Sequence, residues 1–287
     1  MSSGFRKCIL VKVLLFALAG CSDELDLPVN RPKVVIEGFI EQDEYPLVYL
    51  TLSSGYYEPV DSSSLLELVL TTARVAISDG EQEEVLTLFR NTEVFPPFYY
   101  QATDIRGEVG KAYTLEVRSR QDIYVAETVI KQPLELDSIW FQYDEGSDNL
   151  GNIWIEFQDN PLEENFYRVF TRRRGKDSNY VPIYQSAIGD RSFNGEQFQV
   201  SILRGSGAFS DVTDDFFFEK GDTVDIRFCT IDKPHFDFWR TLEQELYLTG
   251  NPFGSVGNEI SSNVEGTRKA LGVWGGYGAS YYQYIVK

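Results

Sequence analysis

Apolar and polar residues alternate with a period of two along most of the chain, in short runs separated by turn residues. This period places successive side chains on opposite faces of a β-strand. The first runs lie at 33–40, 46–53, 73–80, 83–89, 98–102, 111–118 and 123–130. Seven short strands with turns between them predict an immunoglobulin-like β-sandwich over residues 33–133.

The alternating pattern resumes after Pro133, which ends the last of these strands. Further runs begin near Asp137 and continue at 151–159, 165–173, 180–185, 196–203, 214–231 and 280–287. They predict a second β-sandwich over residues 134–287. The expected fold is therefore mainly β, with two tandem antiparallel β-sandwich (immunoglobulin-like) domains, the second containing one α-helix.

A helical period of 3.6 replaces the strand period at about 233–249. Asp232 can cap the N-terminus of this helix, and Pro234 suits its first turn. Apolar side chains then recur on one helical face, at Phe236, Trp239, Leu242 and Leu246. The spacing predicts a helix whose aromatic stripe packs against the second sheet as core.

Tyr113 stands at the start of a predicted strand, just after a glycine-rich approach. This is the setting of a tyrosine corner, in which the phenol bonds to backbone upstream. The alternative is an ordinary tyrosine at a strand end.

The N-terminal residues 1–20 have the pattern of a secretory signal peptide. A cationic start precedes an apolar run at 11–19 that is too short to span a bilayer. The run ends in Leu18-Ala19-Gly20-Cys21, which resembles the bacterial lipobox. We expect Cys21 to be acylated, to become the first mature residue and to anchor the chain in membrane lipid. In the alternative, a conventional cleavage leaves Cys21 incidental. Residues 21–32 are acidic and predict an extended tether.

Charge and cysteine content narrow the possible functions. The chain has 44 Asp and Glu against 26 Lys and Arg, a formal net charge of −18. A nucleic acid partner needs a basic surface and is therefore not expected. Cys8 lies in the signal and Cys21 carries the lipid, so Cys229 alone remains and cannot form an intrachain disulfide.

The usual catalytic and metal-binding patterns are not found in the sequence. His235 is the only histidine, so every Ser-His-Asp or Cys-His arrangement would depend on it. No Cys/His spacing suits zinc. The acidic turns at 144–149 and 210–215 superficially resemble calcium loops, but both lack the full EF-hand spacing. We therefore expect no catalytic residue, no metal site and no cofactor.

The last third of the chain carries a set of motifs that are specific only in combination. They are Lys220-Gly221-Asp222, Asp237-Phe238-Trp239, Asn251-Pro252-Phe253, Ser262-Asn263 and the run 271–277, LGVWGGY. With the lipobox and the run VVIEGFI at 34–40, they resemble a lipoprotein family of unknown function, domain of unknown function 4249. At residues 265–272 the sequence departs from the pattern of this family. This difference concerns only the geometry of the local loop.

This resemblance implies an outer-membrane lipoprotein of Bacteroidota that faces the cell exterior and is often encoded beside a TonB-dependent transporter. It implies no established activity and no catalytic residues. The expected function is a non-enzymatic accessory or binding partner of such a nutrient transporter.

Two other functions stay open. One is a stand-alone glycan- or peptide-binding module with exposed aromatic side chains, such as Trp140, Trp154 or Trp274. The other is a hydrolase that relies on paired carboxylates. Trp274 and Tyr277 lie in the glycine-rich run near the C-terminus. There the glycines either allow close approach of another backbone, with the two rings filling the space, or form an exposed surface for a ligand or partner.

Overall fold

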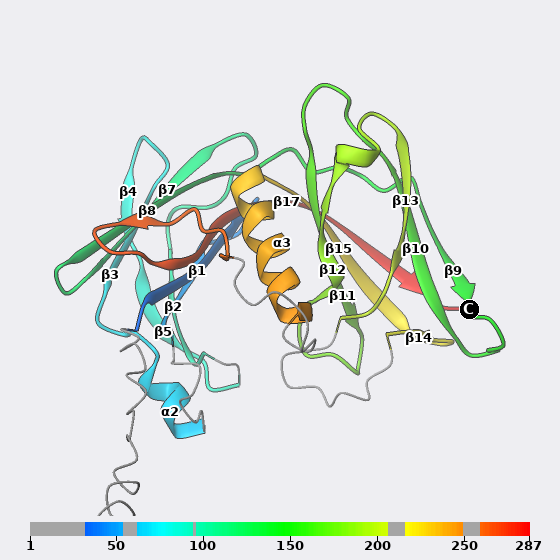
Figure 1. Ribbon diagram of the computed structural model, residues 1–287, viewed down its shortest axis with the longest axis horizontal. Coiled ribbons are helices and arrows are strands. Elements are labelled where there is room, and N and C mark those ends of the chain that lie inside the picture. Colours follow the sequence, from blue (N-terminus) through cyan, green and yellow to red (C-terminus); the bar gives the residue numbers. More distant parts are fainter. Residues whose placement is uncertain (1–31, 54–61, 94–95, 206–215, 249–258) are drawn as a thin grey trace, which may run out of the picture. The chain divides into compact units, whose positions relative to one another are not determined.

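A computed structural model describes residues 32–287 except 54–61, 94–95, 206–215 and 249–258 (Figure 1). The signal peptide, Cys21 and the tether up to residue 31 lie outside the described residues, as does the Asn251-Pro252-Phe253 motif. Contacts within Pro32–Lys287 join these residues into one unit.

Short strands follow each other as the alternating pattern predicts. The elements up to residue 129 are β1 (Val34–Glu41), β2 (Leu47–Leu52), α2 (Ser62–Glu67), β3 (Arg74–Ser78), β4 (Glu83–Val85), β5 (Thr87–Arg90), β6 (Phe98–Gln101), β7 (Ala112–Ser119) and β8 (Asp122–Val129). The remaining elements are β9 (Ser138–Tyr143), β10 (Leu150–Gln158), β11 (Phe166–Arg173), β12 (Val181–Gly189), η1 (Asp190–Ser192), β13 (Gln197–Ile202), β14 (Phe218–Glu219), β15 (Thr223–Ile231), α3 (Lys233–Leu248), β16 (Glu265–Gly266) and β17 (Leu271–Ile285).

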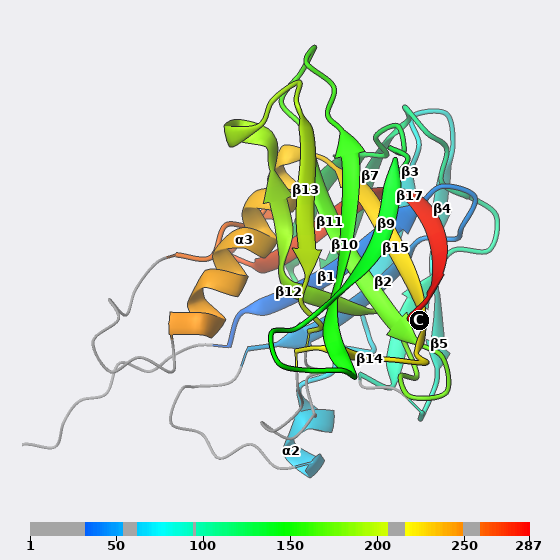
Figure 2. The same ribbon diagram turned by 90° about the vertical axis from the view of Figure 1, so that its right-hand side faces the viewer.

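The strands form three sheets. The largest has eight strands in the order β12-β11-β15-β17-β1-β2-β6-β5. A five-stranded sheet has the order β16-β8-β7-β3-β4, and a four-stranded sheet joins β13, β10 and β14, with β9 paired to β10. Figure 2 shows β13, β10 and β9 in front of β11 and β15. The prediction of a mainly β chain with sandwich-like sheets is confirmed.

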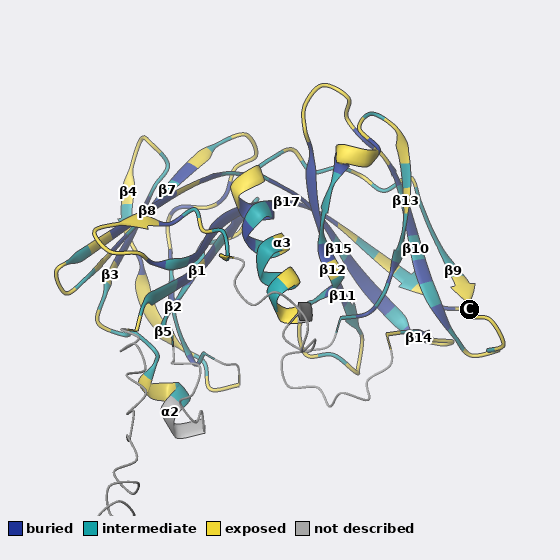
Figure 3. Cartoon of the chain, viewed as in Figure 1, coloured by how far each residue is buried: buried dark blue, intermediate teal, exposed yellow. Residues whose placement is uncertain are grey.

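Each smaller sheet shares a hydrophobic core with a different part of the eight-stranded sheet. One core joins Ile36 and Leu50 of that sheet to Val75 and Leu115 of the five-stranded sheet. The other joins Phe228 of β15 to strands of the four-stranded sheet. Buried residues also follow the first part of β17, whose last residues alternate between exposed and half-buried (Figure 3). The cores thus occupy the faces where alternation places the apolar side chains.

Strand β17 belongs to both parts of the eight-stranded sheet. Its first residues pair with β1 in parallel, from Val35 opposite Leu271 to Glu41 opposite Tyr277. Its remaining residues pair with β15 in antiparallel register, ending with Thr223 opposite Ile285. The parallel pairing differs from the expected wholly antiparallel sheets. The two predicted halves therefore share one sheet through the C-terminal strand, and β16, also from the C-terminal region, pairs with β8.

The glycines of the 271–278 run lie where β17 passes close to other parts of the chain. A Cβ atom on Gly275 would lie 2.3 Å from ring atoms of His235, and one on Gly278 would lie 2.0 Å from the carbonyl oxygen of Lys131. Real Cβ atoms do not approach other atoms so closely, and only glycine fits at these positions. The interpretation of this run as a strand in close approach is confirmed.

Helix α3 and the tyrosine corner also agree with the sequence. The helix spans Lys233–Leu248, close to the predicted 233–249. Phe236 is buried as expected, but Leu246 is 65% exposed. The Tyr113 hydroxyl donates to the carbonyl oxygen of Arg106 over 3.0 Å and accepts from the amide of Glu108. The sequence analysis did not predict the six-residue helix α2.

Candidate functional site

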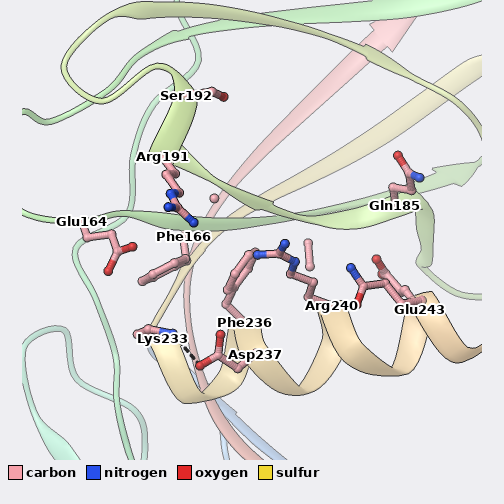
Figure 4. Close-up of a pocket in the computed structure, with 13 residues that line it drawn as sticks. Glu164, Phe166, Gln185, Arg191, Ser192, Lys233, Phe236, Asp237, Arg240 and Glu243 are labelled. Atoms are coloured by element: carbon pink, nitrogen blue, oxygen red, sulfur yellow. Dashed lines mark hydrogen bonds and ion pairs between the residues drawn. The ribbon is translucent and has the colours of Figure 1, made fainter. Parts of the chain in front are cut away.

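A groove of about 910 Å³ runs between strand β12 and helix α3 (Figure 4). We call it the α3–β12 groove. Its volume lies in the range of small-molecule binding sites. The lining residues come from three places in the chain: Glu164 and Phe166 at the start of β11; Gln185, Ala187, Gly189, Arg191 and Ser192 from β12 and η1; and Lys233, Phe236, Asp237, Arg240, Glu243 and Gln244 from α3.

The local sequence explains both walls of the groove. The α3 residues recur at intervals of three and four, so they share one face of the helix. On β12, Ala187 and Gly189 are separated by two and share one face of the strand, whereas Gln185, with a φ of 55°, lies where the register with β11 shifts. Ala187 and Gly189 have little or no side chain, and this leaves room above the strand.

Asp232 fixes the start of the helical wall. Its carboxylate accepts a hydrogen bond from the His235 amide over 2.9 Å, as a capping residue does. The other carboxylate oxygen accepts from the Thr128 hydroxyl over 2.6 Å and from the Val129 amide over 3.2 Å. The helix cap is therefore also bonded to β8.

Stacked aromatic rings form the floor of the groove. The rings of Phe166 and Phe236 lie 4.6 Å apart with an interplanar angle of 29°. Arg191 extends toward them from η1, and Arg240 extends from α3 toward β12 (Figure 4). The Arg240 guanidinium lies 5.7 Å from the centre of the Phe236 ring. The centre of the groove thus combines a flat apolar surface with two cationic groups.

Three other charged residues of the groove, Lys233, Asp237 and Glu243, already have partners. The Lys233 ammonium lies 2.6 Å from a carboxylate oxygen of Asp237. The Glu243 carboxylate accepts hydrogen bonds from the hydroxyl and the amide of Ser186. The first contact joins two residues of α3, and the second joins α3 to β12.

A buried arginine supports the groove from beneath. Arg168 of β11 is only 3% exposed. Its guanidinium donates to the Ser186 hydroxyl over 3.1 Å and to the Tyr277 hydroxyl over 2.7 Å. It also lies 3.5 Å from the centre of the Trp239 ring. A buried cation is costly unless it is bonded, and here hydroxyl and ring contacts supply the compensation. Arg168 thereby connects β17, β12 and α3.

A second arginine, which is half-buried, lies on the same face of the eight-stranded sheet. Arg227 of β15 forms an ion pair with Glu41 of β1, and Glu41 also accepts a hydrogen bond from Tyr281. The Arg227 guanidinium lies 4.5 Å from the centre of the Tyr277 ring. This cluster of side chains connects the three neighbouring strands β1, β15 and β17, where the two halves of the chain share one sheet.

His235 and Cys229 are both buried in this region. Burial, reinforced by the Arg168 charge, lowers the pKa of His235 to about 3, so its ring is neutral at physiological pH. Burial raises the pKa of the Cys229 thiol to about 12, so the thiolate does not form near neutral pH. Neither side chain lines the groove. The interpretation of both residues as packing rather than reactive groups fits these positions.

Trp274 and Tyr277 lie in the interior instead of on an exposed docking surface. Trp274 is 0% exposed, and its indole nitrogen donates to the carbonyl oxygen of Tyr113 over 3.0 Å. Tyr277 is 4% exposed and bonds to Arg168. The expectation that these two residues contact a ligand or partner at the surface is therefore corrected. Their rings fill the space beside the glycines of β17, as in the structural interpretation of this run, to which the exposed surface was the alternative.

Trp140 and Trp154 have a different position. They lie directly opposite each other on β9 and β10, with ring centres 6.0 Å apart and planes 13° apart. Both are half-buried. Neighbours such as Ile153 and Ile155 point into the core, so alternation places the two indole rings on the opposite face of this sheet.

The candidate calcium turns give no support for a metal site. Within the described ranges, no group of three or more His, Cys, Asp or Glu residues could hold a metal ion. The turn at 144–149 is described, with Gly146 at a φ of 83°. The turn at 210–215 lies outside the described residues.

Sequence reasoning missed the groove itself. Arg191 and Arg240 are ordinary surface residues in the sequence, and Phe166 belongs to an alternating strand. They are brought together only because α3 packs against the edge strand β12 and its neighbour β11. The available signal was the polar face of α3, in which Lys233, Asp237 and Arg240 recur at helical spacing.

A family model described as "Domain of unknown function (DUF4249)" matches residues 22–283 of the chain. No curated protein matches the sequence.

We expect His235 to make the stability of the protein depend on pH below about 6.5. The unfolded chain binds a proton at this residue below its ordinary pKa of 6.5, whereas the folded chain binds it only near pH 3. Between these values the unfolded state holds more protons, so the free energy of unfolding falls as pH falls, by about 1.4 kcal/mol per pH unit. Urea unfolding from pH 6.5 to 5 measures this slope.

The matched control is His235→Gln, which removes the only histidine and leaves every carboxylate in place. We expect the variant to lose most of the slope over this pH range, whatever its stability at pH 7. An unchanged slope in the variant would show that His235 is not responsible.

Proposed function

The chain belongs to the DUF4249 family, and on this premise we propose that it is a lipid-anchored, non-enzymatic binding protein of the outer membrane that works beside a TonB-dependent nutrient transporter. In this proposal Cys21 is the acylated residue, and the described residues face the cell exterior. The acidic residues 21–32 act as a spacer between the lipid and β1.

The α3–β12 groove is the observation that supports this proposal. It is open, lies between two regular elements and is held by bonded residues on both walls. A site on such elements keeps its shape without a ligand, as a binding protein requires. Among the described residues, no helix is long and apolar enough to cross a membrane.

The positions of the reactive side chains favour binding over catalysis. The buried thiol of Cys229 and the neutral ring of His235 lie beneath the sheet surface and cannot reach a ligand in the groove. The carboxylates of Asp237 and Glu243 are engaged with Lys233 and Ser186. Ligand contact in the groove would therefore come from arginine, aromatic and amide side chains.

Purification of the tagged full-length chain from native membranes in mild detergent tests the proposal. We expect mass spectrometry to find an acylated Cys21 and a TonB-dependent transporter in the same complex. Cys21→Ser should abolish the acyl group and release the chain from the membrane. Cys8→Ser, which changes the other N-terminal cysteine, should alter neither property. An unmodified Cys21, or a chain that is repeatedly recovered alone, would contradict the proposal.

A second candidate function is saccharide binding on the outer face of the four-stranded sheet. The Trp140–Trp154 pair favours it, because adjacent indole rings offer an apolar surface to the C–H face of a sugar. Polar side chains continue this face of the sheet. The amides of Gln197 and Gln199 both donate to the carboxylate of Glu156.

For this second candidate we expect retardation of the protein in gels that contain a neutral polysaccharide. Trp140→Ala or Trp154→Ala should weaken binding by about tenfold, since one aromatic contact contributes ~1 kcal/mol or more. The matched control is Phe89→Ala, which removes one ring of another stacked pair, Phe89 with Tyr99 on β5 and β6. Retardation that is equal in all variants would exclude this face as a saccharide site.

A further inference from the structure

The two arginines at the centre of the α3–β12 groove differ from seven arginines of this chain that form ion pairs with carboxylates. Acidic residues exceed basic ones by 44 to 26. Arginines that form ion pairs are accordingly common: Arg74, Arg118, Arg172, Arg173, Arg174, Arg227 and Arg268. Arg191 and Arg240 have no ion-pair partner among the described residues, although Glu164, Asp237 and Glu243 line the same groove.

The guanidinium groups of these two arginines extend into the groove from opposite walls (Figure 4). Arg191 belongs to η1, and Arg240 belongs to the exposed face of α3. A guanidinium presents its donors in a planar fork that matches a carboxylate. Two guanidinium groups that extend into one groove from opposite sides can both donate hydrogen bonds to a single anionic group between them.

The apolar surface beneath the arginines is small, because Phe166 is 6% and Phe236 5% exposed. Phe166 and Phe236 stack at 4.6 Å, and Ala187 and Gly189 add no bulk above them. Phe236 is buried on its other side in a cluster with Ile231 and Cys229, which holds its ring in place. An apolar or aromatic body next to the anionic group would cover this floor and lose its contact with water.

The ends of the groove limit the ligand to one anionic group. Glu164 lies near the Lys233 end, and Glu243 lies at the other end, toward Gln185 (Figure 4). A ligand with negative charges along its whole length would meet these carboxylates. A ligand with one carboxylate at the centre would not.

We infer that the groove binds a small ligand that carries one carboxylate beside a flat apolar or aromatic body. Arg191 and Arg240 bind the carboxylate, and the Phe166–Phe236 pair contacts the body. This inference rests on the proposed function, which makes the groove the ligand site. A carboxylate of this kind occurs in short peptides with an aromatic C-terminal residue and in acidic sugars.

Calorimetric titration of the detergent-solubilised full-length chain tests the inference with 3-phenylpropionate and its neutral amide as probes. We expect the acid to bind at least about tenfold more tightly than the amide, because hydrogen bonds to charged groups are the stronger ones. Arg191→Gln and Arg240→Gln should each weaken acid binding by about tenfold and leave amide binding unchanged. Arg268→Gln, an exposed arginine outside the groove, is the matched control and should bind like the wild type.

Equal binding of acid and amide would overturn the inference, as would acid binding that neither groove arginine affects. Failure of the acid to bind at millimolar concentration would also overturn it. When the two probes bind equally, Ala187→Trp, which fills the groove, separates failure of this inference from failure of the proposed function. If it abolishes equal binding of both probes, the groove remains a ligand site and only the carboxylate assignment falls. Co-purification with a transporter is measured independently of either probe.

Further titrations distinguish the two sources of the carboxylate. One compares N-acetylphenylalanine with its amide, and the other compares galacturonate oligomers with neutral galactose oligomers. Because Glu164 and Glu243 stand at the ends of the groove, we expect the singly charged amino acid derivative to bind and the multiply charged oligomer to bind weakly. Tighter binding of the oligomer would overturn the assignment of a single carboxylate.

Discussion

The whole structure depends on the C-terminal strand β17, which has two different partners along its length. Its first residues pair in parallel with β1 and its later residues pair in antiparallel register with β15. A strand that is buried in the middle of a sheet cannot leave its backbone groups unpaired. Both partners must therefore be in place before β17 is satisfied. The first and last strands of the described chain are thereby adjacent, and the two sandwich cores share one sheet.

The position of β17 also affects the α3–β12 groove, through residues that contact this strand. Gly275 leaves room for the ring of His235, and His235 lies in the first turn of the helix that forms one wall. Tyr277 bonds to Arg168, and Arg168 bonds to Ser186, which in turn bonds to Glu243 on the same helix. A continuous set of buried polar contacts thus runs from the central strand to the binding surface. Such a network is stable only when every member has a partner, and this requirement fixes how α3 lies on the sheet.

The sequence predicts local elements well because their causes are local. Alternation predicts most strands, a capping Asp232 and helical spacing predict α3, and a glycine-rich approach predicts the Tyr113 corner. The parallel pairing of β1 with β17 is not predictable in this way. It is a non-local pairing, because it joins residues more than two hundred positions apart in the chain. The glycines of β17 also interrupt the alternation that identifies a strand. The glycine pattern predicts that Trp274 and Tyr277 can fill the space beside the strand, but it leaves an exposed surface open as the alternative. The groove arginines lie on separate elements, and only the crossing of α3 brings them together.

Amide hydrogen exchange of the full-length chain tests most directly whether β17 makes the two halves one unit. This measurement gives the free energy of opening of individual backbone amides, and it can be followed separately in β1, β15 and β17. The shared sheet predicts that the central amides of these three strands open together, with the same free energy as global unfolding. Opening of β1 and β2 at a clearly lower free energy, while β15 stays protected, would contradict it. The two sandwiches would then be independent domains, and the network beneath the groove would not depend on the strand between them.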